Sequence, residues 1–376
     1  MKSKLIFEDA YYDGQSYIYF FSREINALFR QDVKTNTAEF LLTIEEYKND
    51  AERLYGTVVC ACDKLYFCPS SADDILIYDI KSNSYSLIPI EKRNDYKGDD
   101  AKFFSMSVSG NHLYIFPAHY PAIIQLDMKT NSVHYLTSWL KDIESDLGDG
   151  KDYFRQSVCN IDGSMIVPFC YKDSVLILDT KDERITIKDI KTGRTDHHGF
   201  AGICRDGDTC WMVSLTGDMV YAWNYYTDQI DEYQLQNRNK EGSYAFVGCY
   251  YWRGNIFIRP AKRNDFYIIN VEDKTINSYS ADTYDVDVNA YSEISSTVLA
   301  IVEIEEDYLL MCTRNGICYK LYKQGNDWEF AEMEFDNEEA IKKWMTISNY
   351  KTGNKILKEK EGFWRLDTYL QTIIEQ

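Results

Sequence analysis

Histidine side chains are the first candidates for chemistry in this chain. His197 and His198 are adjacent, and His119 lies earlier in the sequence. Imidazole nitrogens with a nearby carboxylate can hold a divalent metal ion, and such a site could support lyase chemistry. The spacing matches no ligand motif such as His-Glu-x-x-His. Solvent-exposed loop histidines are the simpler interpretation. We therefore expect no metal and no cofactor, with a metal-dependent lyase as an alternative.

Carboxylates form a second group of candidates. Acidic clusters occur at residues 95–100, 142–152 and 282–287. Paired carboxylates can hydrolyse glycosidic bonds. The segment 146–152 superficially resembles a calcium loop, but it lacks the alternating carboxylates and the closing Glu. No Gly-x-Ser-x-Gly nucleophile motif, phosphate loop or dinucleotide fingerprint is present. Solvated acidic loops are the preferred interpretation, and no catalytic residue is identified.

An aromatic residue recurs where successive predicted strands begin. A collar of exposed rings could stack on a sugar or a cation. A residue repeated in five units is more simply part of the scaffold, so packing is the preferred interpretation. Carbohydrate binding requires these rings to face solvent. The five residues are Tyr55, Phe103, Phe154, Phe200 and Phe246.

These aromatic positions belong to a unit of roughly 48 residues, a period typical of propeller repeats. The clearest copies of its anchor begin at Asp32, Asp79 and Asp127, and the first of them reads Asp-Val-Lys-Thr-Asn-Thr. Weaker copies begin at Asp179, Asn224, Asn270 and Leu321. Within a unit, short apolar runs are separated by Gly, Asn, Asp and Pro, which is typical of strands joined by tight turns.

This repeat predicts an all-β fold, a seven-bladed β-propeller of four-stranded antiparallel blades with a short helical C-terminal tail. We expect residues 1–335 to form the propeller and 336–376 the tail, packed on it. Asn337 is predicted to cap a helix that runs to about Ile347, and a second helix is expected at 363–374. A docking helix for a partner is the alternative for this tail. The predicted repeats lie near residues 4–44, 55–90, 103–139, 154–190, 199–235, 245–281 and 295–334.

The repeated pattern of second strand, Pro, third strand and Asp-x-Lys-Thr-Asn turn resembles the kelch-like and quinoprotein-like β-propellers. The similarity covers about residues 4–335. The paired glycines of kelch units and the Gly-His and Trp-Asp signatures of WD repeats are missing. The resemblance implies a binding platform more often than an enzyme, which is an inference from fold alone.

The charge and the cysteines limit the partners and the compartment. The formal net charge is −19, which argues against nucleic acid and anionic membranes as partners and permits a basic protein or peptide. A neutral sugar is also permitted. No secretory signal or apolar run long enough for a membrane span is visible. The ten cysteines are interpreted as reduced, buried side chains of a cytoplasmic protein.

The binding site is expected on the face that carries the long loops between blades, at residues 91–102, 140–153, 190–199, 236–244 and 281–293. Residues that break the repeat are the preferred ligand-binding candidates. The first hypothesis is a non-catalytic platform for a protein or peptide. The alternatives are a carbohydrate-binding or carbohydrate-active protein and the metal-dependent lyase. The candidate residues are His119, Tyr120, Arg155, Gln156, His197, His198, Lys262, Arg263 and Tyr291.

Overall fold

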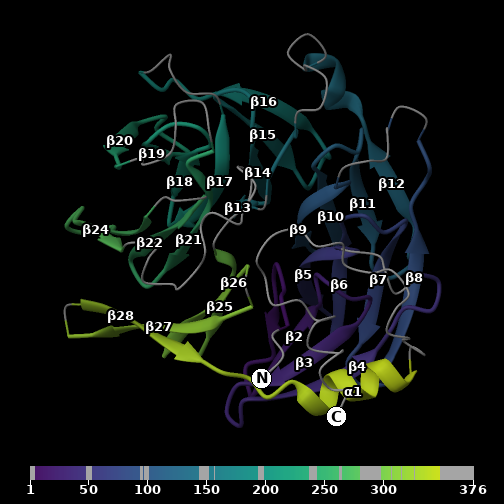
Figure 1. Ribbon diagram of the computed structural model, residues 1–376. Helices are drawn as coiled ribbons and strands as arrows, with labels where there is room; N and C mark the ends of the chain where they lie inside the picture. The colour runs from purple at the N-terminus through teal and green to yellow at the C-terminus, as the bar shows by residue number, and fades with distance from the viewer. Residues whose placement is uncertain are drawn as a thin grey trace. The chain divides into compact units, whose positions relative to one another are not determined.

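Seven four-stranded antiparallel sheets make up the computed structural model, and they confirm the predicted seven-bladed β-propeller (Figure 1). Each blade is built from four consecutive strands. The chain divides into two compact units, one of residues 1–90 with 298–376 and the other of residues 91–297. The structure describes residues 5–47, 53–93, 96, 101–143, 152–155, 157–193, 199–236, 244–261, 265–279, 298–305, 307–314, 316–325 and 327–347.

The unit of residues 1–90 and 298–376, called unit 1, contains three blades. Its strands are β1 (Tyr11–Tyr12), β2 (Tyr17–Phe21), β3 (Leu28–Asp32), β4 (Thr37–Leu42), β5 (Tyr55–Ala61), β6 (Lys64–Pro69), β7 (Asp74–Asp79), β8 (Ser84–Pro89), β25 (Val298–Ile304), β26 (Tyr308–Thr313), β27 (Cys318–Gln324) and β28 (Asp327–Met333).

The unit of residues 91–297, called unit 2, contains four blades and a short 3₁₀ helix, η1 (Ser138–Asp142). Its strands are β9 (Phe103–Ser109), β10 (His112–Pro117), β11 (Ile123–Asp127), β12 (Val133–Leu136), β13 (Cys159–Ile161), β14 (Ser164–Pro168), β15 (Ser174–Asp179), β16 (Ile185–Asp189), β17 (Phe200–Asp206), β18 (Thr209–Ser214), β19 (Met219–Asn224), β20 (Ile230–Gln234), β21 (Phe246–Trp252), β22 (Asn255–Pro260), β23 (Phe266–Asn270) and β24 (Ile276–Tyr279).

The repeated Asp-x-Lys-Thr-Asn anchor is the turn between the third and fourth strands of a blade. The carboxylate Oδ1 of Asp127 accepts hydrogen bonds from the backbone N–H groups of Lys129 at 2.8 Å and Thr130 at 2.9 Å. Asn131 then adopts a left-handed φ of 61°. The bonds from Thr130 and Lys129 lower the pKa of Asp127. The recurrence of this sequence therefore has a local cause, since Asp and Asn are favoured where a side chain caps a tight turn.

The predicted anchor at Leu321 is wrong. Leu321 lies inside β27 and pairs with Phe330 of β28. The turn of this blade lies beyond Gln324, where Gly325 has a φ of 64°. The hairpin β27–β28 is longer than its counterparts, so alignment by spacing placed the turn too early.

Replacing Asn131 by alanine should lower the free energy of unfolding by about 1 kcal/mol, because the short polar side chain of asparagine makes a left-handed φ more accessible than it is to alanine. Glycine at this position should be tolerated, since it adopts this φ without steric cost. The urea midpoint of each variant measures the effect. Equal destabilisation by alanine and glycine would show that the free energy of unfolding depends on the Asn131 side chain and not on its φ.

Several turns between first and second strands have two consecutive left-handed residues, as the type I′ hairpin requires. The pairs are Cys62–Asp63, Asp162–Gly163 and Arg253–Gly254. Cys62 is therefore a turn residue with a φ of 52°, and β5 ends at Ala61. Cys60 lies within β5, so the two cysteines do not share one strand face.

The chain after β28 returns to the first blade within unit 1. Asp336 forms a parallel bridge with Thr37 at the start of β4. The N–H of Ala38 donates to the carbonyl of Asp336 at 2.9 Å, and the N–H of Asp336 donates to the carbonyl of Asn36 at 2.7 Å. This segment joins the last blade to the first by main-chain hydrogen bonds.

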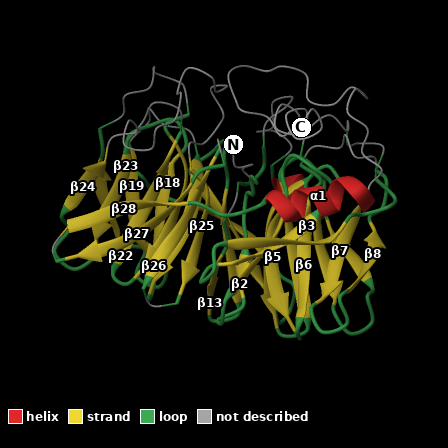
Figure 2. Cartoon of the chain, turned by 60° about the horizontal axis from the view of Figure 1, so that its bottom comes forward, coloured by secondary structure: helices red, strands yellow, loops and turns green. Residues whose placement is uncertain are grey.

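Helix α1 (Glu338–Ile347) follows this bridge and confirms the predicted helix. It lies against β4, as Figure 2 shows in red. Ile341 and Trp344 are fully buried in an apolar cluster with residues of the first and last blades. The helix expected at 363–374 lies outside the described residues. Within the described part of the chain, no helix combines the length and apolar character needed to cross a bilayer.

The inner strands of unit 2 approach one another closely. A β-carbon on Gly202 of β17 would lie 2.8 Å from the Cα of Gly248 in β21. Such a contact is closer than β-carbons tolerate, so this approach requires glycine.

Candidate functional site

The five aromatic residues of the predicted collar are buried. Each is at most 1% exposed, which leaves no ring face for a sugar or a cation. Phe154, for example, lies 4.8 Å from Phe169 and 5.5 Å from Trp139 between ring centroids. Tyr55 donates a hydrogen bond to Asp74 and packs on Phe21. These rings pack in the interior of the protein. This agrees with the sequence interpretation that preferred packing over ligand binding.

Three of the nine ligand-binding candidates, His119, Tyr120 and Arg155, lie within the described residues. The structure places them all in unit 2. The other six lie outside the described residues: Gln156, His197, His198, Lys262, Arg263 and Tyr291.

Tyr120 is part of the interior. It is 1% exposed, and its ring centroid lies 4.9 Å from that of Phe103. Its hydroxyl donates to the carbonyl of Glu91 at 2.8 Å. This residue holds the segment that precedes β9 and offers little surface to a ligand.

His119 and Arg155 are brought together by Asp152. The Nε2 of His119 lies 3.0 Å from Oδ1 of Asp152, and a terminal nitrogen of Arg155 lies 2.5 Å from Oδ2. The Asp152 side chain is only 14% exposed. The acidic segment 142–152 was interpreted as a solvated loop, and for Asp152 that interpretation is wrong. A buried carboxylate needs paired charges, and these two side chains supply them.

Backbone hydrogen bonds fix the segments that carry these side chains. The N–H groups of Ala118 and His119 donate to the carbonyl of Lys102 at 2.8 and 3.3 Å. The N–H of Tyr153 donates to the carbonyl of Ala118 at 2.7 Å, and that of Cys170 to the carbonyl of Tyr153 at 3.1 Å. These hydrogen bonds link the β10–β11 loop to the segment before β13, and they link that segment to the β14–β15 loop.

The Arg155 guanidinium lies among aromatic rings. Its central carbon is 5.0 Å from the ring centroid of Tyr244 and 5.7 Å from that of Phe104. We call His119, Asp152, Arg155, Phe104 and Tyr244 the Arg155 cluster. Burial opposes the charge of Arg155, but Asp152, Cys170 and Tyr244 together outweigh it, and the pKa of Arg155 is raised. The cation is thus held charged in a fixed orientation.

One hydrogen-bond donor of this cation is unused. The Nε of Arg155 is buried and has no hydrogen-bond partner among the residues that the structure describes. A buried donor without an acceptor costs about 1–3 kcal/mol. An acceptor oxygen brought by a ligand would remove this cost.

The histidine of the cluster is held at both ring nitrogens. Its Nδ1 lies 3.0 Å from the carbonyl of Ala101, and its Nε2 faces Asp152. Each contact is a hydrogen bond only when the ring nitrogen that faces it carries a proton. In the parts of the chain that the structure describes, no three His, Cys, Asp or Glu side chains are arranged to hold a metal ion.

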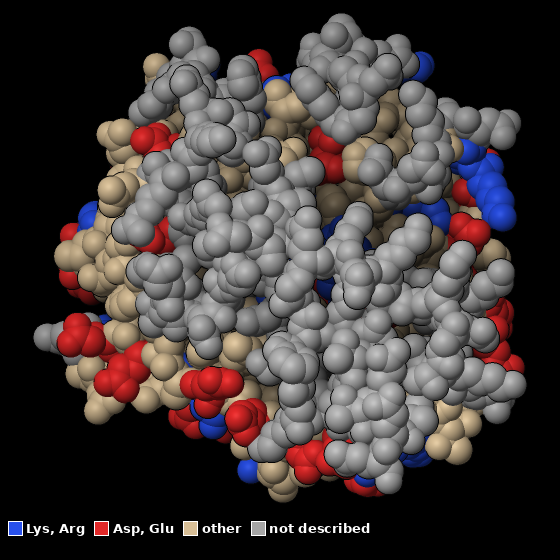
Figure 3. Space-filling view, viewed as in Figure 1, with Lys and Arg blue, Asp and Glu red and all other residues tan. Residues whose placement is uncertain are grey.

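The face shown in Figure 3 carries both signs of charge. Figure 3 shows Lys and Arg side chains standing among Asp and Glu side chains on the face it displays. The acidic segments 95–100 and 282–287 fall almost entirely outside the described residues. The protein is thus a β-propeller in which Arg155 lies between aromatic rings, close to the segments that join the blades.

Comparison with known proteins supports the fold. Neither a protein-family model nor a curated protein matches the sequence. The extracellular domain of the putative hybrid two-component system BT4673 from B. thetaiotaomicron is a similar solved structure, with a TM-score of 0.60 and 12% identity. The match covers 85% of this chain but 38% of that one, so this chain spans less than half of it.

Two further similar structures are matched over most of their length. A chain of the mitotic checkpoint complex has a TM-score of 0.56 and 12% identity, with 86% of this chain and 89% of that chain covered. The WD40 repeats of RRP9 have a TM-score of 0.56 and 8% identity, with 84% and 89% covered. At these identities the likeness establishes the β-propeller fold alone.

Proposed function

We propose that this chain is a non-catalytic β-propeller that binds a protein or peptide, and that the Arg155 cluster is an anchor of its binding surface. The observation that carries the proposal is the Arg155 guanidinium, fixed by Asp152 between two aromatic rings with its Nε unpaired. Arg and Tyr are enriched among the residues that dominate protein interfaces. A pre-organised arginine also loses little side-chain freedom on binding.

The comparisons support a role in assembly. One similar structure belongs to the mitotic checkpoint complex, and another consists of WD40 repeats. We extend this property to the present chain by analogy of fold. A kelch-like or quinoprotein-like affiliation is a finer proposal, which rests on the Asp-x-Lys-Thr-Asn turns. Carbohydrate recognition is left out because the rings that it required are buried.

We propose two further properties from composition. A formal net charge of −19 favours a basic partner, since opposite charges accelerate encounter. Arg155 would then donate a hydrogen bond to one oxygen of that partner. The ten cysteines are free thiols, and this supports a reducing compartment such as the cytoplasm.

The double substitution of His119 and Tyr244 by alanine should lower the affinity for the partner at least tenfold. Interface anchors are each worth about 2 kcal/mol or more, and this variant removes two neighbours of Arg155 while leaving the ion pair of Arg155 with Asp152. The measurement is affinity purification of the tagged full chain from its native cell, followed by titration of the stoichiometric partner.

Tyr226→Ala is the matched control. Tyr226 lies in the turn between β19 and β20 of the same unit and is 54% exposed. Binding by this variant should stay within twofold of the parent protein. A partner retained equally by the double variant, or lost only from Tyr226→Ala, would contradict the proposal. Circular dichroism establishes that each variant is folded.

A further inference from the structure

A cavity lies in unit 1 where residues of the first and last blades meet. It is lined by Gln31 of β3 in the first blade, by Ile317 before β27 and by Met333 at the end of β28 in the last blade, and we call it the seam cavity. Its volume is about 50 Å³, which exceeds the roughly 10–15 Å³ that one water molecule needs. The seam cavity is therefore large enough for a small chemical group.

Much of the wall of the seam cavity is apolar. Leu5, Met333 and Phe335 line it, and all three belong to the buried cluster that also contains residues of α1. Asp336, which follows Phe335, is held by its bridge to Thr37. Packing and main-chain hydrogen bonds therefore fix this wall in place.

A buried hydrogen-bond acceptor belongs to the same cavity. Gln31 is 2% exposed, and its Nε2 donates to Oδ1 of Asn337, which also lines the cavity, at 3.1 Å. This bond fixes the orientation of the Gln31 amide. The Oε1 of Gln31 is buried and has no hydrogen-bond partner among the residues that the structure describes. A buried acceptor without a donor costs free energy, and a donor brought by a ligand would offset that cost.

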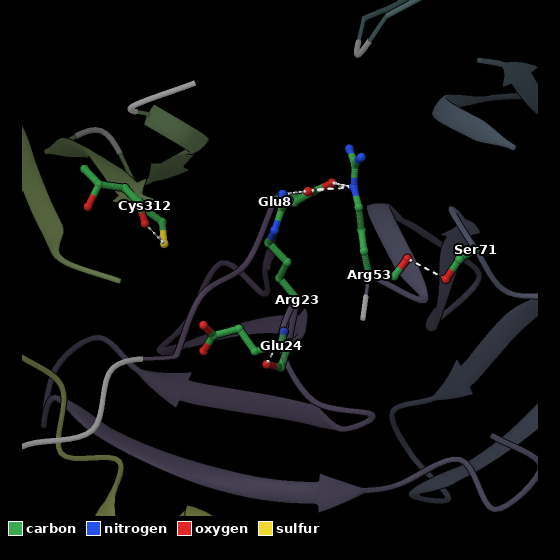
Figure 4. A network of polar contacts seen from close by, with 8 residues as sticks. Glu8, Arg23, Glu24, Arg53, Ser71 and Cys312 are labelled. Carbon is green, nitrogen blue, oxygen red and sulfur yellow. Dashed lines mark hydrogen bonds and ion pairs between the residues drawn. The ribbon is translucent and has the colours of Figure 1, made fainter. Parts of the chain in front are cut away.

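The buried carboxylate of Glu8, in the same unit, is in a different situation. Arg23 forms an ion pair with Glu8, and the Nε of Arg53 lies 2.8 Å from its Oε1 (Figure 4). Cations of the protein itself thus hold the Glu8 carboxylate. The Oε1 of Gln31 has no such donor from the described residues.

The charges at the seam cavity favour a cation. Glu332 and Glu334 line it, and both residues are exposed. None of the described residues that line it is a lysine, an arginine or a histidine. Carboxylates attract a cation and repel an anion. A positively charged donor therefore fits this cavity better than a negatively charged group.

We propose that the seam cavity binds a primary ammonium group carried on an alkyl chain. An ammonium group has three N–H donors and no acceptor. One donor would bond to Oε1 of Gln31 and another to the carboxylate of Glu332, while the alkyl chain would pack on Leu5 and Met333. The seam cavity lies in unit 1, and this proposal does not rest on the function proposed above for the Arg155 cluster of unit 2.

The test is calorimetric titration of the full chain with n-butylamine at pH 7 and constant ionic strength, with n-butanol as the uncharged counterpart. Glu332→Gln should weaken binding of n-butylamine about threefold to fivefold, the range for an exposed ion pair. Gln31→Met should weaken it at least about tenfold, because this variant removes a buried hydrogen bond to a charged group.

Glu329→Gln is the matched control for Glu332→Gln. It removes the same charge from the same strand, where Glu329 accepts a hydrogen bond from the hydroxyl of Tyr322 and does not line the cavity. Its affinity for n-butylamine should equal that of the parent protein. Equal affinities of Glu332→Gln and Glu329→Gln would overturn the proposal.

A second titration distinguishes the sources of the ammonium group. Tighter binding of acetyl-lysine methylamide, acetylated at its α-amino group, than of n-butylamine would identify a lysine side chain of a protein. The reverse order would identify a free amine, and both results support the site. Equal binding of n-butylamine and n-butanol, or no saturable heat with either amine, would overturn the proposal. Circular dichroism checks that the variants are folded, and if Gln31→Met is not, the comparisons of the two Glu variants and of amine with alcohol decide.

Discussion

Replacing Trp344 by alanine should lower the free energy of unfolding by about 3–5 kcal/mol, the usual range when a buried tryptophan is truncated. Trp344 is fully buried and packs into the cluster that contains residues of the first and last blades and α1. The truncation leaves a cavity where α1 meets this cluster. Urea unfolding followed by far-ultraviolet circular dichroism measures the change.

The matched control for this prediction is Ile347→Ala in the same helix. Ile347 is 52% exposed, so its truncation should change the free energy of unfolding by less than about 0.5 kcal/mol. If Trp344→Ala were no more destabilising than Ile347→Ala, then α1 would contribute little to holding the first and last blades of unit 1 together.

The second large effect is expected at Arg53. Replacing it by methionine should lower the free energy of unfolding by about 3 kcal/mol at pH 7, because the buried Glu8 loses one of its partners. Arg30→Met removes an exposed ion pair with Glu39 and should cost less than about 1 kcal/mol. Urea unfolding of both variants provides the comparison.

The destabilisation caused by Arg53→Met should become smaller as the pH falls. The pKa of Glu8 is lowered from its ordinary value of 4.5 in the folded protein, so its contribution to stability is fully present above that value. The contribution is lost as the pH falls through the lower folded pKa. The difference between Arg53→Met and the parent protein should therefore shrink as the pH falls below 4.5. A difference that stayed constant over this range would contradict the role given to Glu8.

The repeat made the architecture predictable because its signals are local. The turn that begins at Asp127 is determined by side-chain bonds to the next few backbone groups. Helix α1 was predictable for the same reason, since its acidic first turn and apolar stripe lie within one short segment. The longer β27–β28 hairpin could not be found by spacing, because its extra residues shift the turn within an otherwise regular unit.

The candidate site was only partly predictable, since its contacts join segments far apart in sequence. His119 and Arg155 were visible as departures from the repeat, but Asp152, which pairs with both, resembled any other loop acid. Tyr120 also departs from the repeat, yet tertiary packing buries it. No sequence signal distinguishes a tyrosine that fills a core from one that meets a partner.

Contacts between cysteines were also not predictable from the sequence, because they join segments that are far apart in it. Cys159 and Cys210 lie in one buried apolar cluster, and Cys204 and Cys249 lie in another. Each pair joins strands of different blades in unit 2. Burial with these thiol neighbours raises the pKa of Cys159 and Cys204, so both are unreactive core thiols. Strand alternation alone does not identify such neighbours.

Site-specific cross-linking tests the central claim, a partner bound at the Arg155 cluster, most directly. In one variant, benzoylphenylalanine would replace Lys172 in the β14–β15 loop, which also carries Cys170 beside Arg155. In the other, it would replace Tyr226 in the β19–β20 turn. Irradiation of cells should yield one stoichiometric cross-linked protein from position 172 and none from position 226. Cross-linking from position 226 alone, or from neither position, would contradict the account.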